Sequence, residues 1–431
     1  MSFASPTPTV TARPGWRLRL LRYLVVAGPG LIVMVADNDA GAVSTYTQAG
    51  AEYGTHLLWV LIALLPVTYF VQEMVARLGI ATGQGHAAMI YQRFGTWWGR
   101  FSLFDLLLVN FLTLVTEFAA IALAAQAAGV AAALAVPLAA AGLVLLVGTG
   151  SYRRWERMTL GLCALSFGWF WLALAVHPDW GAALHHTMVP NLPTGGLTGS
   201  LVFLIIAIVG TTIAPWQLFF QQSCVADKRL RFADLGAARL DTMIGAVAVV
   251  GFAGCMMLVG DALHRAGGQY SDPAHMAGAL RPLIGRAGAG LVLVLMANAA
   301  LLGATAISLS SAWAWGEVMG GRNTLEASMS EAPRFYAAYA LCVGAAAALV
   351  LIPGAPLQTI ILGVQVLAGI MLPSAIVFLQ LLLNDTELLG PRFVNRRWNN
   401  WVNWTVIGVL FALSLVLAVQ VLLPGLSFPA A

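Results

Sequence analysis

Long apolar runs dominate the chain, and each is close to the length that a helix needs to cross a bilayer. A membrane-spanning helix takes about 20 mostly apolar residues, and on that rule about eleven segments are expected. They cover approximately residues 20–53, 56–82, 100–130, 131–148, 157–176, 197–225, 235–264, 287–318, 337–352, 357–383 and 402–423. A short polar helix is expected at 85–94, and a long loop passes through Pro178 and Pro193. The pattern predicts an all-α polytopic membrane protein.

Two of these segments are interrupted midway. The first is broken at 37–41 by Asp-Asn-Asp-Ala-Gly, and the sixth at 211–216 by Thr-Thr-Ile-Ala-Pro-Trp. Hydrocarbon offers the backbone no water, so such interruptions persist only where protein or an aqueous cavity surrounds them. Interrupted spans at corresponding positions of two halves indicate the binding site of a transporter. Because the sixth span enters the membrane in the direction opposite to the first, spans one to five and six to ten can form an inverted repeat.

The composition excludes an ordinary soluble protein and gives no sign of an enzyme. The 431 residues are 60% hydrophobic and 9% charged, with a mean hydropathy of +0.83, whereas a soluble domain has roughly 25% charged residues. The four cysteines lie in apolar segments without CxxC spacing, so neither a disulfide framework nor a zinc site is expected. No nucleophile and base set, phosphate-binding loop or metalloprotease motif is present. The expected partners are the bilayer and a small ion or molecule, not nucleic acid.

Basic residues fall on alternate loops and predict the topology. Lys and Arg in short loops mark the cytoplasmic side, and they occur before the first span and after the second, fourth, sixth, eighth and tenth. The outer loop after the seventh span is the exception, with Arg265, Arg281 and Arg286. The expected N-terminus is therefore cytoplasmic and the C-terminus outside. The predicted organisation is a tail at 1–19, a transporter core at 20–383 with repeats at 20–176 and 197–383, and a loop with a final helix at 384–431. The arginine-dominated, alanine-rich composition favours a bacterial inner membrane.

The aspartates of the first break are the main candidates for cation binding. On a continuous helix they would point about 200° apart, so only an unwound segment lets both approach one cavity. Each carboxylate costs a few kcal/mol at mid-bilayer unless a cation or a proton compensates it. Asp39 is the expected ligand, with Asp37 and Asn38 assisting it. The alternative interpretation is that one aspartate only caps the half-helix that begins near Ala40.

In the sixth span, a proline removes one backbone donor. Carbonyl groups near Thr211 and Ala214 are thereby released towards the site, with Trp216 beside them. A simple proline kink is the alternative.

Polar residues in other spans are secondary candidates. Glu117 and Glu73 could carry a proton. The alternative is a hydrogen bond to a neighbouring helix, which explains Glu117 as well as proton transfer does and explains Glu73 better. Gln365 could line the cavity, although an interhelical hydrogen bond is the simpler role. Asp241 and Asp105 lie near cytoplasmic ends, where a solvated or arginine-paired role is expected.

Residues around the first break carry a family resemblance. Gly-Pro-Gly at 28–30, the aspartate-containing break and Gln-Ala-Gly-Ala at 48–51 resemble the first helix of the NRAMP family of divalent-metal transporters. Ala-Arg-Leu-Gly-Ile-Ala-Thr-Gly at 76–83 is similar to the second helix of that family. The resemblance implies the inverted-repeat fold of the amino acid, polyamine and organocation superfamily, with unwound first and sixth helices and the substrate between them.

The chain also departs from the family pattern. The family's Asp-Pro-Gly-Asn motif falls on 39–42, where Asp39 is kept and Ala42 replaces the asparagine. Its Met-Pro-His motif falls on 214–216, where Ala214 and Trp216 replace the sulfur ligand and the histidine. The lost methionine resembles the magnesium-transporter branch. Of the two third-helix acids that help move protons in the family, Glu117 matches the first, and the second falls on an alanine.

These features lead to two hypotheses about the transported substrate. The first is secondary transport of Mg²⁺ or Mn²⁺, with H⁺ as a candidate coupling ion and no resident cofactor. Hard cations take oxygen ligands, and the absence of sulfur predicts weak discrimination in favour of Cd²⁺ or Fe²⁺. The alternative is an amino acid or other organic cation, with Asp39 pairing its amino group and Trp216 stacking on it. A membrane sensor that transports nothing is a third, weaker hypothesis.

Overall fold

The computed structural model describes residues 28–193 and 198–422, together with residues 23, 26 and 196. The predicted tail at 1–19 lies outside this part, as does most of the start of the first span. Every regular element in the described part is helical. The helices are α2 Pro29–Ala36, α3 Ala40–Tyr53, α4 Leu58–Thr82, α5 His86–Ala127, α6 Ala132–Gly148, α7 Tyr152–Leu165, α8 Gly168–Ala175, α9 Trp180–Met188, α10 Gly199–Thr212, α11 Pro215–Asp227, η1 Phe232–Asp234, α12 Leu235–Arg265, α13 Pro273–Ala279, α14 Arg281–Met319, α15 Pro333–Val350, α16 Leu357–Leu382, α17 Thr386–Phe393 and α18 Arg397–Leu422.

The spans predicted from hydropathy are present as helices. Among the described residues, 8 helical segments are long and apolar enough to cross a membrane. The α2–α3 pair, the 17-residue apolar helix α6 and α18 complete the expected set. The predicted polar helix at 85–94 is the first part of α5, which turns at Gly95 (φ 83°) before the third span begins. The loop predicted between the fifth and sixth spans contains the additional helix α9.

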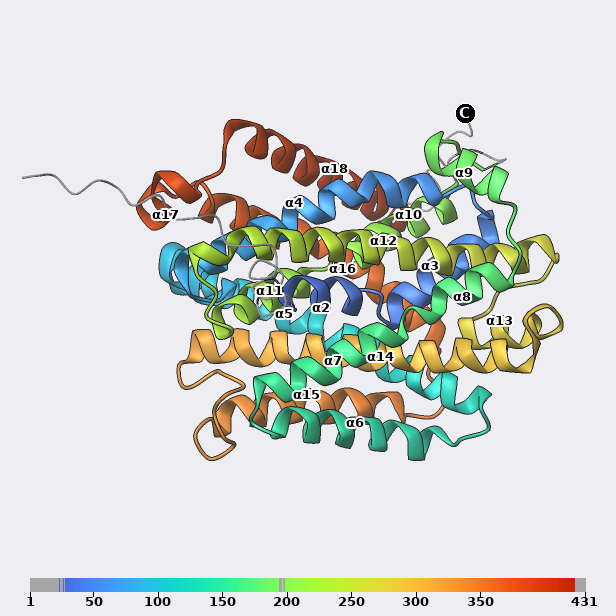
Figure 1. Cartoon of the computed structure of the whole chain (residues 1–431), viewed down its shortest axis with the longest axis horizontal. Helices are drawn as coiled ribbons and strands as arrows, with labels where there is room; N and C mark the ends of the chain where they lie inside the picture. The colour runs from blue at the N-terminus through green and yellow to red at the C-terminus, as the bar shows by residue number, and fades with distance from the viewer. Residues whose placement is uncertain (1–22, 24–25, 27, 194–195, 197, 423–431) are drawn as a thin grey trace, which may run out of the picture.

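The helices run mostly along the long axis of the molecule (Figure 1). The connections at 83–85, 149–151, 228–231, 320–332 and 383–396 all lie at the same end of the bundle, here called the basic end (Figure 1). These connections and the helix ends beside them carry the arginines that the sequence assigns to the cytoplasmic side, whereas Arg265, Arg281 and Arg286 lie at the opposite end. Which side of the membrane this end faces stays a prediction.

Both predicted breaks separate two half-helices near the centre of the bundle (Figure 1). Between α2 and α3, Asp39 adopts an extended conformation (φ −73°, ψ −170°) and begins α3 as its N-cap. Between α10 and α11, Ile213 and Ala214 are extended, and Pro215 occupies the first turn of α11. Proline is suited to that position because its missing N–H has no partner in the first turn of a helix.

Glycines allow α3 and α12 to touch backbone to backbone. A Cβ on Gly260 would stand 2.1 Å from the carbonyl oxygen of Thr47, and one on Gly50 would stand 2.0 Å from that of Met257. Real Cβ atoms do not approach backbone so closely, so any side chain at either position must push the two helices apart. Helix α3 starts at the first break, and this contact therefore fixes the position of Asp39 along the bundle.

Candidate cation site at the two helix breaks

The first break buries three polar side chains. Asp37, Asn38 and Asp39 are at most 3% exposed. Asp39 Oδ1 accepts a hydrogen bond from the N–H of Ala42 at 2.9 Å, so the capping role is present. The Asn38 amide donates to the Val249 carbonyl of α12 at 3.3 Å, and its Oδ1 has no hydrogen-bond partner.

A chain of amides joins the first break to the second. Gln217 of α11 donates from Nε2 to Asp37 Oδ1, and its own Oε1 accepts from Gln72 Nε2 of α4 at 2.8 Å. Asp37 Oδ2 is buried and has no hydrogen-bond partner. The carboxylate of Asp37 is therefore held in one orientation with one oxygen atom left available.

Glu117 of α5 meets the same break. Its Oε2 accepts a hydrogen bond from the N–H of Ala40 at 3.1 Å, and its Oε1 has no partner. Gly303 of α14 permits the approach, because a Cβ there would stand 2.7 Å from Asp39 Cβ and 2.8 Å from Glu117 Cδ. Two neighbouring buried carboxylates repel each other, so a cation or a proton between them would offset their charge.

Gln365 of α16 reaches the break from another side. A Cβ on Gly41 would stand 1.5 Å from Gln365 Nε2, so the side chain of Gln365 fills the space that this glycine leaves. Gln365 is buried, and its Nε2 has no hydrogen-bond partner. The structure thus places Gln365, a secondary candidate in the tenth span, directly beside the start of α3.

The second break contributes oxygen atoms from side chain and backbone. Thr211 Oγ1 is buried without a hydrogen-bond partner, whereas Thr212 Oγ1 bonds the Tyr46 hydroxyl of α3 at 2.7 Å. Because Ala214 is extended and Pro215 has no N–H, the carbonyl groups of the last turn of α10 lack the usual helical donors. The hydrogen bond between Tyr46 and Thr212 ties this break to the first.

Trp216 belongs to an aromatic cluster. Its side chain is fully buried, and its ring lies 6.1 Å from that of Phe220, centroid to centroid. Phe220 in turn packs against Trp313 at 5.7 Å and Trp155 at 6.0 Å. The ring of Trp216 therefore contributes to the packing of α11 against α14.

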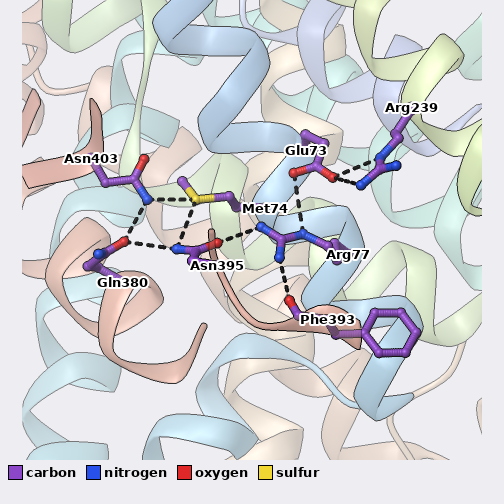
Figure 2. Close-up of polar contacts among 8 residues, drawn as sticks. All are labelled: Glu73, Met74, Arg77, Arg239, Gln380, Phe393, Asn395 and Asn403. Carbon is purple, nitrogen blue, oxygen red and sulfur yellow. Dashed lines mark hydrogen bonds and ion pairs between the residues drawn. The ribbon is translucent and has the colours of Figure 1, made fainter. Parts of the chain in front are cut away.

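Glu73 is separate from both breaks. It lies towards the basic end, where it pairs with Arg77 of its own helix and with Arg239 of α12 (Figure 2). Arg239 donates from Nε and Nη2 to the same Glu73 oxygen, at 2.9 and 2.7 Å. These ion pairs give Glu73 a structural role, and nothing in its contacts links it to Asp39.

Oxygen atoms without partners are the common feature of the two breaks. They are Asp37 Oδ2, Asn38 Oδ1, Glu117 Oε1 and Thr211 Oγ1. Within the described residues, no group of three or more His, Cys, Asp and Glu side chains is arranged to hold a metal. A cation here would thus need mixed carboxylate, amide, hydroxyl and carbonyl oxygens, which suits a hard and partly hydrated ion.

A family model covers nearly the whole chain, from residue 30 to residue 420. It describes natural resistance-associated macrophage protein-like proteins, the Nramp family. The chain belongs to this family. Similar relatives include "Divalent metal cation transporter MntH" of Granulibacter bethesdensis, 27% identical over 98% of this chain and 97% of the relative. "Divalent metal cation transporter MntH 1" of Pseudomonas aeruginosa is 29% identical over 92% of each.

Solved structures show that the Nramp fold extends through the chain. A manganese transporter of Eremococcus coleocola matches with a TM-score of 0.77 at 19% identity, over 95% of this chain and 88% of that one. Mhp1, a nucleobase-cation-symport-1 family transporter, matches with a TM-score of 0.56 at 15% identity, over 92% of this chain and 91% of that one. Both similarities support the predicted inverted-repeat fold with unwound first and sixth helices.

Two residues of this Nramp chain acquire roles that its sequence did not reveal. Gln217 has no predicted role, although an amide in an apolar span is a signal of a polar contact between helices. Asp241, expected to be solvated or arginine-paired, is instead buried and accepts hydrogen bonds from the backbone N–H groups of Gly28, Gly30 and Leu31. This correction has a physical reason, because the first turn of α2 leaves its N–H groups without helical partners and favours an anion there.

Replacing Asp241 is expected to loosen α2. Asp241→Ala removes the acceptor for three N–H groups, those of Gly28 and Gly30 buried and that of Leu31 part-buried. Each buried N–H left unsatisfied costs about 1–3 kcal/mol. Amide hydrogen exchange in α2 should therefore accelerate strongly, with a smaller acceleration in Asp241→Asn, which keeps one carbonyl acceptor. Mass-spectrometric exchange of α2 peptides, with α6 peptides as the internal control, measures this. Equal exchange in wild type and Asp241→Ala would refute the anchoring role.

Proposed function

We propose that this protein is a secondary transporter that carries a divalent metal cation, Mn²⁺ or Mg²⁺, through the site at the two helix breaks. The observation that carries the proposal is the buried Asp37-Asn38-Asp39 break, whose Asp37 Oδ2 and Asn38 Oδ1 lack hydrogen-bond partners. Membership of the Nramp family and the names of the relatives support the substrate class.

Hard oxygen ligands define the proposed binding mode. Asp39 coordinates the cation, Asp37 and Asn38 assist with their free oxygen atoms, and Thr211 with the carbonyl groups near Ala214 completes the shell. The set contains no sulfur, and Mg²⁺ and Mn²⁺ prefer carboxylate, carbonyl and water ligands. Weak selection of Cd²⁺ follows from the same chemistry.

The contacts between the breaks suggest how binding moves the helices. Gln217 connects α11 to Asp37, and Tyr46 connects α3 to Thr212. A cation held by Asp37 thus draws on groups from both broken helices, whose half-helices then move together during alternating access. Glu117, beside Asp39, is the proposed proton carrier, because a proton there can offset the charge when the cation leaves.

The alternative substrate class receives less support. An organic cation was expected to stack on Trp216, but that ring packs within an aromatic cluster of α11 and α14.

Uptake into proteoliposomes tests the proposal. Vesicles containing the purified protein are expected to take up Mn²⁺ in a saturable manner, with competition by Mg²⁺ and weaker competition by Ca²⁺. Cd²⁺ should show no advantage over Mn²⁺, because the site offers no soft ligand. Protein-free vesicles and an amino acid mixture are the controls. Saturable uptake of an amino acid, with none of any divalent cation, would establish the alternative.

The proposed setting is a bacterial inner membrane, with the basic end in the cytoplasm. Bacterial relatives support the inner membrane. The arginine and lysine residues in and beside the connections of the basic end support its cytoplasmic side.

A further inference from the structure

A cavity at the basic end lies outside the cation site. It measures ≈ 410 Å³ and is formed by the end of α4, the start of α12 with η1, and the segment that joins α17 to α18. Its lining includes three arginines, Arg77, Arg239 and Arg396, and a single carboxylate, Glu73. The pocket therefore carries an excess of two positive charges.

The network in Figure 2 fixes the floor of this pocket. Arg77 donates to the Phe393 carbonyl and to Asn395 Oδ1, the latter at 2.6 Å, and also pairs with Glu73. These contacts hold the guanidinium group of Arg77 in place and connect α4 to the α17–α18 segment. The side chain of Arg77 is 7% exposed, so it forms a preorganised wall of the pocket.

The other two arginines leave donors available at the mouth. Arg239 uses Nε and Nη2 for Glu73, and its side chain remains 48% exposed. The side chain of Arg396 is exposed and forms no hydrogen bond or ion pair with any residue that the structure describes, while the Arg396 carbonyl accepts from the Asn400 N–H at 3.2 Å. Guanidinium groups in this arrangement match the oxygen atoms of a phosphate group.

The surroundings of the pocket are those of a bilayer interface. Tyr69 and Trp398 line its rim, as amphipathic rings do at the level of lipid headgroups. Four and eight residues beyond Arg239, Met243 and Val247 continue the same face of α12 and are 40% and 56% exposed. Ile62 of α4 is also 43% exposed and apolar, further from the basic end. Exposed apolar surface thus leads from the arginines towards the middle of the membrane.

We propose that this pocket binds the phosphate headgroup of an anionic phospholipid, whose acyl chains lie along the exposed faces of α4 and α12. Basic pockets between transmembrane helices suit such headgroups, and the adjoining apolar faces favour a lipid over free phosphate. The bound lipid fastens the α17–α18 segment to α4 and α12. The proposal is independent of the transported substrate.

Native mass spectrometry with lipid titration tests the proposal on the full-length protein. Phosphatidylglycerol is expected to bind at least about tenfold more tightly than phosphatidylcholine of the same chain length, because the arginines attract its anionic headgroup. Arg396→Ala should weaken phosphatidylglycerol about fivefold and leave phosphatidylcholine unchanged. The matched control is Arg153→Ala, which removes an exposed arginine of α7 at the same end and outside the pocket.

Three results would overturn the proposal. Equal affinity for the two lipids would show that the protein does not prefer an anionic headgroup. If Arg396→Ala and Arg153→Ala weakened phosphatidylglycerol binding equally, the pocket would not be the source of the preference. Complete displacement of phosphatidylglycerol by millimolar inorganic phosphate would assign the pocket to free phosphate. Retention of the lipid in that competition, with loss only in Arg396→Ala, supports the lipid site.

Discussion

Asp39→Asn is expected to weaken Mn²⁺ binding by at least about 100-fold. Mutation of residues that only hydrogen-bond a metal ligand already lowers metal affinity by up to about 100-fold, and Asp39 is proposed to bind the metal directly. The substitution separates the two roles of this residue. Asparagine caps a helix as well as aspartate does, so α3 keeps its hydrogen bond to the Ala42 N–H, while the negative charge is lost. Isothermal titration of the purified variants with Mn²⁺ measures the change.

The matched control for this substitution is Asp272→Asn. Asp272 is the N-cap of α13, and its Oδ1 accepts from the His275 N–H at 2.8 Å, but it is only half-buried and belongs to neither break. Mn²⁺ affinity should be unchanged in this variant. If Asp39→Asn bound Mn²⁺ as wild type does, Asp39 would be a helix cap only, and its proposed role as ligand would be wrong.

Gly260→Ala is expected to cause a large structural defect where α12 touches α3. The added Cβ would stand 2.1 Å from the Thr47 carbonyl oxygen and 2.9 Å from the Ala51 nitrogen, both in the backbone of α3. Overpacking of this kind typically lowers the free energy of unfolding by about 1–3 kcal/mol. The upper end of this range is expected here, because the added methyl group meets rigid helix backbone and not a flexible side chain. Displacing α3 also displaces Asp39, so Mn²⁺ binding should weaken together with thermal stability.

Gly254→Ala is the control on the same helix. A Cβ there meets only Leu58 Cδ2, at 4.0 Å, which is an ordinary contact. Alanine also favours a helix over glycine by about 1 kcal/mol, so the melting temperature should stay or rise. Equal melting temperatures for the two variants, measured in the same detergent, would contradict the close approach of α3 and α12.

The spans and both breaks could be predicted because their signals are local. A run of about 20 apolar residues forms a helix in lipid whatever its neighbours are. Proline at position 215 and the Asp-Asn-Asp sequence disturb such a run at a definite place. Glu117 and Gln365, predicted as secondary candidates, lie beside the first break.

Contacts between distant helices could not be predicted in the same way. The hydrogen bond from Gln217 to Asp37 joins residues 180 positions apart in the sequence. The hydrogen bond from Gly28 to Asp241 joins residues 213 positions apart. Neither pairing leaves a trace in the hydropathy of its own segment. The position of Trp216 in an aromatic cluster also depends on tertiary packing. From the sequence alone, a tryptophan next to a helix break could equally well line a cavity.

The measurement that tests the central claim most directly is Mn²⁺ uptake by proteoliposomes containing wild type or Asp39→Asn, compared at equal protein content. The proposed site predicts saturable uptake by wild type, inhibition by Mg²⁺, and uptake by the variant no greater than that of protein-free vesicles. Wild-type vesicles that take up no divalent cation, or a variant that transports Mn²⁺ as wild type does, would contradict it.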